Sequence, residues 1–183
     1  MTRTKPTEAW HFVREDRRLG YGDGNIVAPG YVYEVSGPVE LCRWGLHASV
    51  KPLDALKFAP GPIVCRVELS GQIKTAEDKA VATRREVLWM SDATNTLHEF
   101  ACQVAEQALR DASVDDACCW AAIDAKRKWL AGEITDFELV ATRTAAEAAA
   151  RAAARAATRT AARAAATRRH NALLAGLLGG LAP

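Results

Sequence analysis

The strongest constraint on the fold is an alternation of apolar and charged residues in the middle of the chain. Apolar side chains occupy every second position from Ile63 to Leu69, and Arg66 and Glu68 stand between them. Side chains two apart on a strand face the same side, so this pattern predicts a half-buried strand. Residues 79–90 carry a further strand pattern and predict another strand.

The residues before this alternation predict further short strands. We expect them over residues 9–13, 26–27 and 31–35, and from residue 41 into a turn at 45–49. Pro52 suits the first position of a short helix, where no backbone donor is needed. Ser70-Gly71 is expected to turn the chain. Residues 1–90 therefore predict a small β-rich domain.

The pattern becomes helical after Ser91. Thr96-x-x-Glu99 is typical of a capping box, and a second helix is expected over residues 114–130. A third helix begins near Thr135 or Asp136 and runs to about residue 174 without glycine or proline, mostly as alanine, the best helix former.

Together these patterns predict an α+β fold in two parts. The first is an α+β domain over residues 1–131, β-rich over 1–90 and helical over 95–131. The second is a long Ala/Arg-rich helical tail over residues 132–183.

The tail differs from the rest of the chain in charge. Residues 141–183 hold seven arginines and one glutamate, so they carry +6 while the whole chain carries only +2. Four of these arginines recur every four residues and form a slowly winding stripe on a helix: Arg151, Arg155, Arg159 and Arg163. The stripe predicts either a phosphate grip on nucleic acid or the solvated face of a stalk that joins subunits.

The cysteines and the apolar stretches exclude several classes. Five cysteines without a C-x-x-C pair indicate no disulfide framework and no metal site. We expect mostly buried thiols in a reducing cytoplasm. The chain opens without a signal peptide, and the apolar run from residue 172 to 182 is too short to cross a membrane.

Candidate site residues gather near the predicted strand ends. His47 and Ser49 follow Gly45, where a ligand could approach closely, although a structural turn explains them equally. We count Trp10, Tyr21 and His47 as candidate ligand-binding residues. Glu86 is either a catalytic acid or a charge at a sheet edge.

These residues carry two resemblances. The chain resembles a family of uncharacterised phage and prophage proteins through short motifs spread over about residues 9–110. The motifs are the segments 9–13, 21–24, 41–42, 45–49, 54–61, 65–71 and 78–83. This resemblance implies an accessory protein but no particular activity.

The second resemblance is to ADP-ribosyltransferases, through the order of a serine-bearing strand end, a helix, a strand and a Glu-bearing strand. It implies that His11, Ser49 and Glu86 are catalytic, with NAD held near His11 and the glutamate stabilising the transition state. Arg84 stands where a second acid would be expected.

The function expected from the sequence is therefore binding, of a host factor or a nucleotide-like ligand, through the β-rich domain. The tail would assemble a homo-oligomer or meet an acidic partner. No cofactor is expected for this role. The alternatives are NAD-dependent ADP-ribosyl transfer and non-specific binding of nucleic acid.

Overall fold

The fold is α+β, as the sequence predicts. The computed structural model describes residues 5–19, 25–140, 142 and 160–181. By its internal contacts the chain divides into two units, residues 1–94 with 174–183 and residues 95–173. The units thus part at residue 94, whereas the sequence analysis placed its boundary after residue 131.

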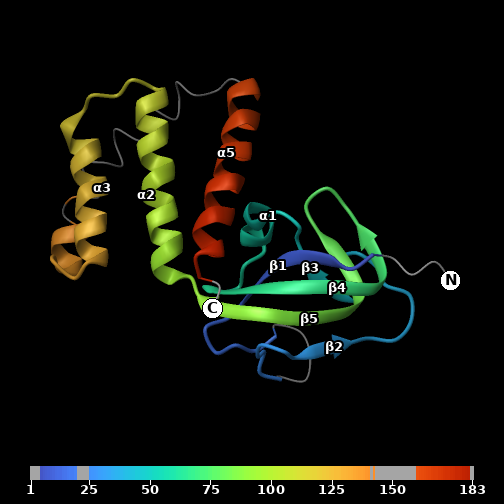
Figure 1. Cartoon of the computed structure of the whole chain (residues 1–183). Helices are drawn as coiled ribbons and strands as arrows, with labels where there is room; N and C mark the ends of the chain where they lie inside the picture. The colour runs from blue at the N-terminus through green and yellow to red at the C-terminus, as the bar shows by residue number, and fades with distance from the viewer. Residues whose placement is uncertain (1–4, 20–24, 141, 143–159, 182–183) are drawn as a thin grey trace. The chain divides into compact units, whose positions relative to one another are not determined.

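The first unit is built on one antiparallel sheet of five strands (Figure 1). The strands β1 (Thr7–Val13), β4 (Ile63–Thr75), β5 (Ala80–Asp92) and β2 (Val32–Glu34) follow one another in that order, and β3 (Leu46–Ala48) also pairs with β5. The long strands β4 and β5 therefore form the centre of the sheet, and the shorter strands pair with them on either side.

The predicted alternation in β4 is confirmed. Ile63, Cys65, Val67 and Leu69 are all buried in one apolar cluster, 5% exposed or less. On the opposite face, Arg66 pairs with Glu8 of β1 at 2.7 Å. The strand is half-buried because its apolar side faces this core and its charged side faces solvent.

Two expectations about the strand ends are wrong. The chain does not turn at Ser70-Gly71, because β4 continues to Thr75 through a shift in register. Gly71 absorbs the shift at φ +78, and a Cβ there would lie 2.2 Å from the Thr83 hydroxyl. Residues 41–43 form a turn rather than a strand, so β3 begins only at Leu46.

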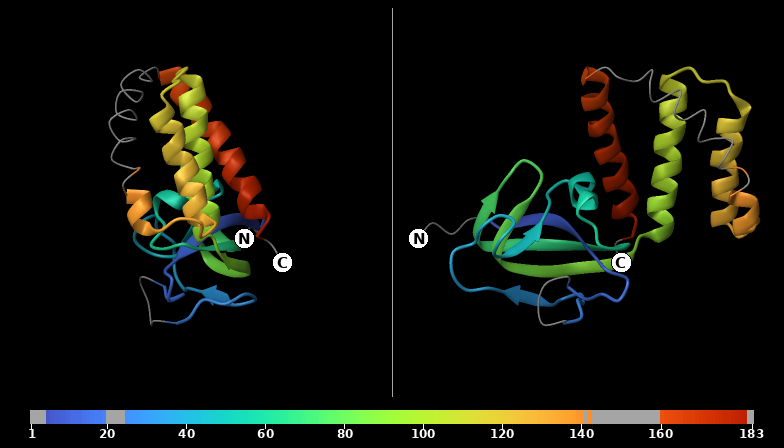
Figure 2. Two further views of the ribbon diagram at one scale, coloured as in Figure 1. Left: turned by 90° about the vertical axis from the view of Figure 1, so that its left-hand side faces the viewer. Right: turned by 180° about the vertical axis from the view of Figure 1, so that it is seen from behind.

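The sheet curls until its two ends meet. Ser49, just after β3, exchanges two backbone hydrogen bonds with Trp10 of β1, at 2.7 and 2.9 Å. The helix α1 (Pro52–Lys57) follows directly and packs against β1, with its proline in the first turn as predicted (Figure 2). The curl brings β1, β3 and β5 around one space.

The second unit holds the helices α2 (Thr94–Asp111) and α3 (Ala117–Leu130). The predicted capping box at Thr96 and Glu99 is wrong. The carboxylate of Asp92 accepts the Thr94 N–H at 2.8 Å, so the helix starts two residues earlier. Glu99 is thereby free to pair with Arg127 of α3.

A third helical segment begins where the sequence predicts it. Residues 136–140 are helical, and Thr135 and Glu138 form a reciprocal cap. Most of the expected long helix lies outside the described residues, which do not include 141 and 143–159. These include Arg151, Arg155 and Arg159.

The other described helix of the tail is α5 (Thr160–Gly179). It contains Arg163, whose side chain lies outside the described part of the structure. Near its end, Leu174 and Leu178 are fully buried. In the described ranges no helix is long and apolar enough to cross a membrane.

Candidate functional site: a basic pocket around a buried arginine

The curled sheet of the first unit encloses a cavity of about 650 Å³. Its walls come from β1, the segment around β3, the end of α1 and the start of β5. Four residues singled out from the sequence line it: Trp10, His11, His47 and Ser49. Cavities of this size are typical of small-molecule sites.

Arg85 of β5 is the central feature of this cavity. Its side chain is only 3% exposed, and one guanidinium nitrogen donates to the backbone carbonyl of His47 at 2.8 Å. Its Nε is buried without any hydrogen-bond partner in the described structure. No carboxylate of the described chain pairs with it, and its guanidinium lies 5.5 Å from the centre of the Tyr33 ring.

Burial lowers the pKa of Arg85 to about 10, so the group still carries its charge at neutral pH. An isolated buried charge is unfavourable unless an opposite charge or further hydrogen bonds offset it. Arg85 thus brings to the cavity wall a buried charge that has no carboxylate partner in the described structure.

The rest of the pocket has the same sign of charge. Arg18, Arg43 and Lys79 also line the cavity, and among its lining residues in the described ranges there is no Asp or Glu. Arg43 pairs with Glu40 at 3.3 Å and Lys79 lies 4.0 Å from Asp78, both outside the lining. Aromatic rings lie among them, including Phe58, against which the Lys79 ammonium packs at 4.5 Å. The surface thus combines positive charge with apolar area.

His47 is held in one orientation. Its Nε2 accepts the backbone N–H of Cys42 at 3.0 Å, which places the ring proton on Nδ1, 3.1 Å from the carbonyl oxygen of Gly45. Burial, Arg85 and Lys79 lower the pKa of His47, although the bond to Gly45 acts in the opposite direction. His47 therefore links the turn at Cys42 to Arg85.

His11 lies in β1, is half-buried and lines the cavity. Burial lowers its pKa well below the usual value, and the charges of Arg85 and His47 lower it further. A neutral imidazole can donate and accept one hydrogen bond each. Ser49 completes this wall of the pocket and is 2% exposed.

Glu86 does not join these residues. Neighbouring side chains of a strand point to opposite faces, so Glu86 lies on the other face from Arg85. There its carboxylate pairs with Arg84 at 2.9 Å, and it stands opposite Glu68 in the register. Of the three residues expected in one cleft, His11 and Ser49 line the cavity and Glu86 does not. Tyr21 lies outside the described residues.

Gly45 fixes the wall next to His47. It has φ +124, and a Cβ there would come within 2.4 Å of Val81 and 3.0 Å of Val39. Only glycine therefore fits this close approach to β5. The sequence suggests a close approach of a ligand at this glycine; in the structure the neighbour that comes this close is β5.

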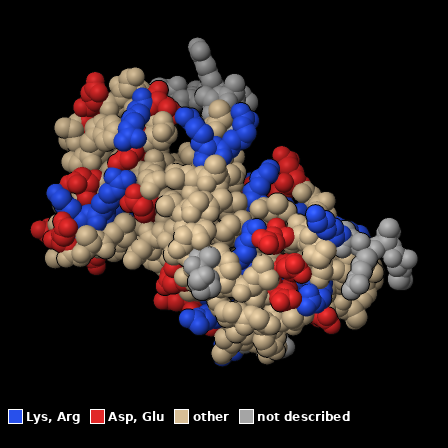
Figure 3. Space-filling view, in the orientation of Figure 1, with Lys and Arg blue, Asp and Glu red and all other residues tan. Residues whose placement is uncertain are grey.

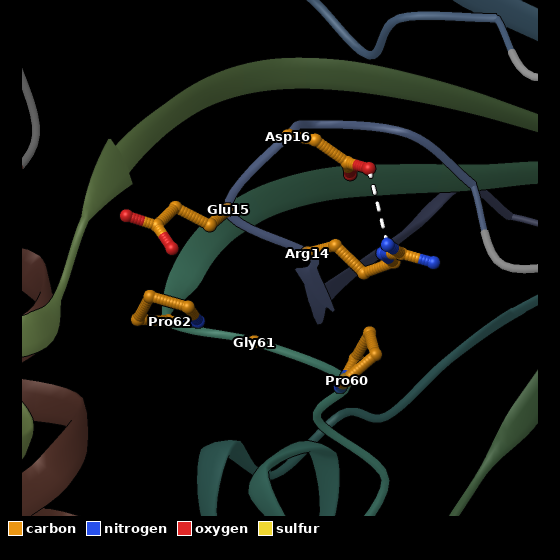
Figure 4. A pocket seen from close by; sticks show the side chains of 6 residues that line it. All are labelled: Arg14, Glu15, Asp16, Pro60, Gly61 and Pro62. Atoms are coloured by element: carbon orange, nitrogen blue, oxygen red, sulfur yellow. Dashed lines mark ion pairs between the residues drawn. The ribbon is translucent and has the colours of Figure 1, made fainter.

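A second hollow of the first unit lacks these features (Figure 4). It lies where Pro60-Gly61-Pro62 passes the end of β1, and it is lined by Arg14, Glu15 and Asp16. The arginine is already paired with Asp16 at 3.3 Å. The cation of this hollow is therefore already neutralised by a carboxylate, unlike Arg85.

The outer surface also shows no single-sign area on the face drawn in Figure 3. Acidic and basic side chains lie interspersed there. In the described ranges no three His, Cys, Asp or Glu side chains gather as a metal site would need. Of the five free cysteines, Cys42 and Cys118 are exposed and three are buried.

The comparison with protein families agrees with the extent of this unit. Residues 8–99 match the domain of unknown function DUF7666, which is half of the chain. The chain belongs to the DUF7666 family. The match contains the pocket residues of β1, β3 and β5 and most of the motifs on which the phage resemblance rests. Comparison with curated proteins and with solved structures gives no match.

Sequence reasoning missed Arg85, the central residue of the DUF7666 pocket. A signal was present, because Arg84 and Arg85 are adjacent in a predicted strand and one of them must face the core. Which of the two turns inward depends on the register shifts between β4 and β5, which local sequence does not specify.

Proposed function

We propose that the DUF7666 domain of this chain binds a small anionic ligand of the nucleotide type in the pocket around Arg85. The observation that carries the proposal is the buried guanidinium with a free Nε and no carboxylate partner. A phosphate group would supply the missing charge and accept hydrogen bonds from the planar guanidinium.

The remainder of the pocket supports a ligand with a second, apolar part. Phe12 and Phe58 line the cavity together with Trp10, and its volume of about 650 Å³ exceeds what a single phosphate fills. A nucleoside phosphate combines an anion with an aromatic ring. His11 offers the ligand one donor and one acceptor.

We propose binding rather than ADP-ribosyl transfer. That reaction would use the carboxylate of Glu86, which lies on the other face of β5 and is paired with Arg84. The pocket wall of Trp10, His11, His47 and Ser49 would serve a binding role without it. NAD incubated with the protein is therefore expected to release no nicotinamide.

The test is calorimetric titration of the full chain with AMP, with adenosine as the uncharged comparison. AMP is expected to bind and adenosine to bind at least about tenfold more weakly, since a hydrogen-bonded charge contributes about 1.5–3 kcal/mol. Arg85→Lys keeps the charge but loses the planar fork, and should weaken AMP binding by a similar factor.

The matched control is Arg84→Lys, one residue away on the opposite face. It should leave AMP binding unchanged. Because Arg85→Lys could disturb folding, its circular dichroism is compared with the wild type, and Lys79→Gln at the rim provides a second variant with reduced affinity. Equal binding of AMP and adenosine, or no binding of AMP at millimolar concentration, contradicts the proposal.

Within this proposal the protein is a phage-type accessory protein, as its motifs suggest. A host protein, a homo-oligomer and nucleic acid stay predictions. For nucleic acid we expect weak, salt-sensitive binding that is lost when residues 141–183 are deleted.

A further inference from the structure

Cys42 stands at the rim of the same pocket with an ammonium group beside it. Its thiol is exposed, and the Lys79 Nζ lies 3.3 Å from Sγ. The residue has φ +63, a conformation that residues other than glycine seldom adopt. Its N–H donates to His47 Nε2 at 3.0 Å, which holds the turn in place.

The cavity into which Cys42 faces is built for an anion independently of this thiol. Arg85 lines it with a buried Nε that has no partner, and its guanidinium donates to the carbonyl of His47. His47 therefore connects the turn that carries Cys42 to the unpaired cation. An anionic molecule that enters the pocket is brought to the thiol.

The other cysteines provide an internal comparison. Cys65, Cys102 and Cys119 are buried, and burial raises the pKa of Cys65 to about 12. Cys118 is exposed like Cys42, but it follows Asp115 and Asp116, and its N–H donates to the Asp116 carboxylate at 2.8 Å. The Cys42 thiol thus has an ammonium group against its sulfur, whereas Cys118 follows two carboxylates.

We infer that Cys42 is a site of covalent modification by small anionic disulfides. The Cys42 thiol gives its proton to solvent, and the thiolate attacks one sulfur of the disulfide. A new S–S bond forms to Cys42 while the old S–S bond breaks. The leaving thiolate departs with the electron pair and takes up a proton, so Cys42 is oxidised and half of the disulfide is reduced.

Two effects would favour this reaction: a higher local concentration of the anionic disulfide, and stabilisation of the negative charge on sulfur in the transition state. Cations around the pocket attract the negative groups of the disulfide, and the Lys79 ammonium lies against the sulfur that develops charge. The attached group would occupy the pocket. Modification would then exclude the anionic ligand proposed above, although the reaction itself does not depend on that ligand.

The experiment compares two disulfides of opposite charge on the folded, full-length chain. Oxidised glutathione is anionic and cystamine is cationic; each is added in limiting amount, and the modified cysteines are located by peptide mass spectrometry. Cys42 should react with oxidised glutathione at least about tenfold faster than Cys118 does. Cystamine should reverse or abolish this preference, and the urea-unfolded chain should show none.

Two lysine variants separate the ammonium from general charge. Lys79→Gln should lower the rate at Cys42 several-fold with the anionic disulfide. Lys57→Gln removes a lysine that pairs with Asp54 and does not line the pocket, and should leave the rate unchanged. Equal rates at Cys42 and Cys118, or no effect of Lys79→Gln, overturns the inference. Selective modification without AMP binding would refute the proposed function alone.

Discussion

At the scale of single residues, the pocket holds an imidazole where protonation is unfavourable. Burial and the nearby charges of Arg85 and His47 keep the pKa of His11 well below its usual value. In the unfolded chain the pKa of the same group is about 6.5. As the pH falls below that value, the imidazole binds a proton in the unfolded chain but not in the folded one. The free energy of unfolding therefore decreases.

The first prediction follows from this difference. Between about pH 6.5 and pH 5, His11 should lower the free energy of unfolding by up to about 1.4 kcal/mol per pH unit, and stability should be complete above pH 6.5. Urea unfolding at several pH values measures the slope. His11→Gln cannot titrate and should reduce it; an equally steep loss in the variant would show that other groups are responsible.

At the scale of elements, one arginine ties α2 to α3. Arg127 of α3 donates to Glu99 at 2.9 Å and also pairs with Glu106, both in α2. These hydrogen bonds raise the pKa of Arg127 and lower that of Glu99. The apolar contact between the helices is modest, with Cys102, Leu109, Cys119 and Ile123 at its centre. The ion pairs therefore set which faces of the two helices meet.

The second prediction is that Arg127→Met lowers the free energy of unfolding by about 1 kcal/mol. The expected loss is small because solvent screens these partly exposed ion pairs. Glu99 would then lose its cation, and Glu106 would keep only its pair with Arg110 of the same helix. Lys128→Met is the control, because Lys128 pairs only with Asp124 of its own helix and should matter little. The difference in thermal unfolding between the variants should shrink in high salt; a difference that survives it would argue for packing instead.

At the scale of the whole molecule, the end of the tail is part of the folded chain. Leu174 and Leu178 are both 0% exposed, and residues 174–183 group by their contacts with residues 1–94. These two leucines are thus covered within a single chain. A homo-oligomer stays a prediction, and light scattering at micromolar concentration tests it.

The third prediction is that Leu174→Ala destabilises the protein by about 2–5 kcal/mol, as expected for a buried leucine replaced by alanine. Leu173→Ala, at a half-buried position of the same helix, should cost clearly less. Denaturant unfolding of both variants measures the difference. Equal, small losses would mean that the leucine at 174 is exposed in solution.

Much of the first unit is determined by local sequence. The alternation from Ile63 to Leu69 specifies a half-buried strand, and Pro52 specifies the start of α1, because period and backbone chemistry act over a few residues. The capping residues Thr135 and Glu138 are readable for the same reason. His47 and Ser49, at the end of a short strand, could be proposed as pocket residues on that basis.

The tertiary structure alone decided which side chains meet. Register shifts between β4 and β5 turn Arg85 into the pocket and Glu86 away from it, and these shifts depend on pairing between distant strands. The hydrogen bonds between Ser49 and Trp10 close the sheet and create the cavity. An unpartnered charge such as that of Arg85 is a property of everything around it, so no local pattern could reveal it.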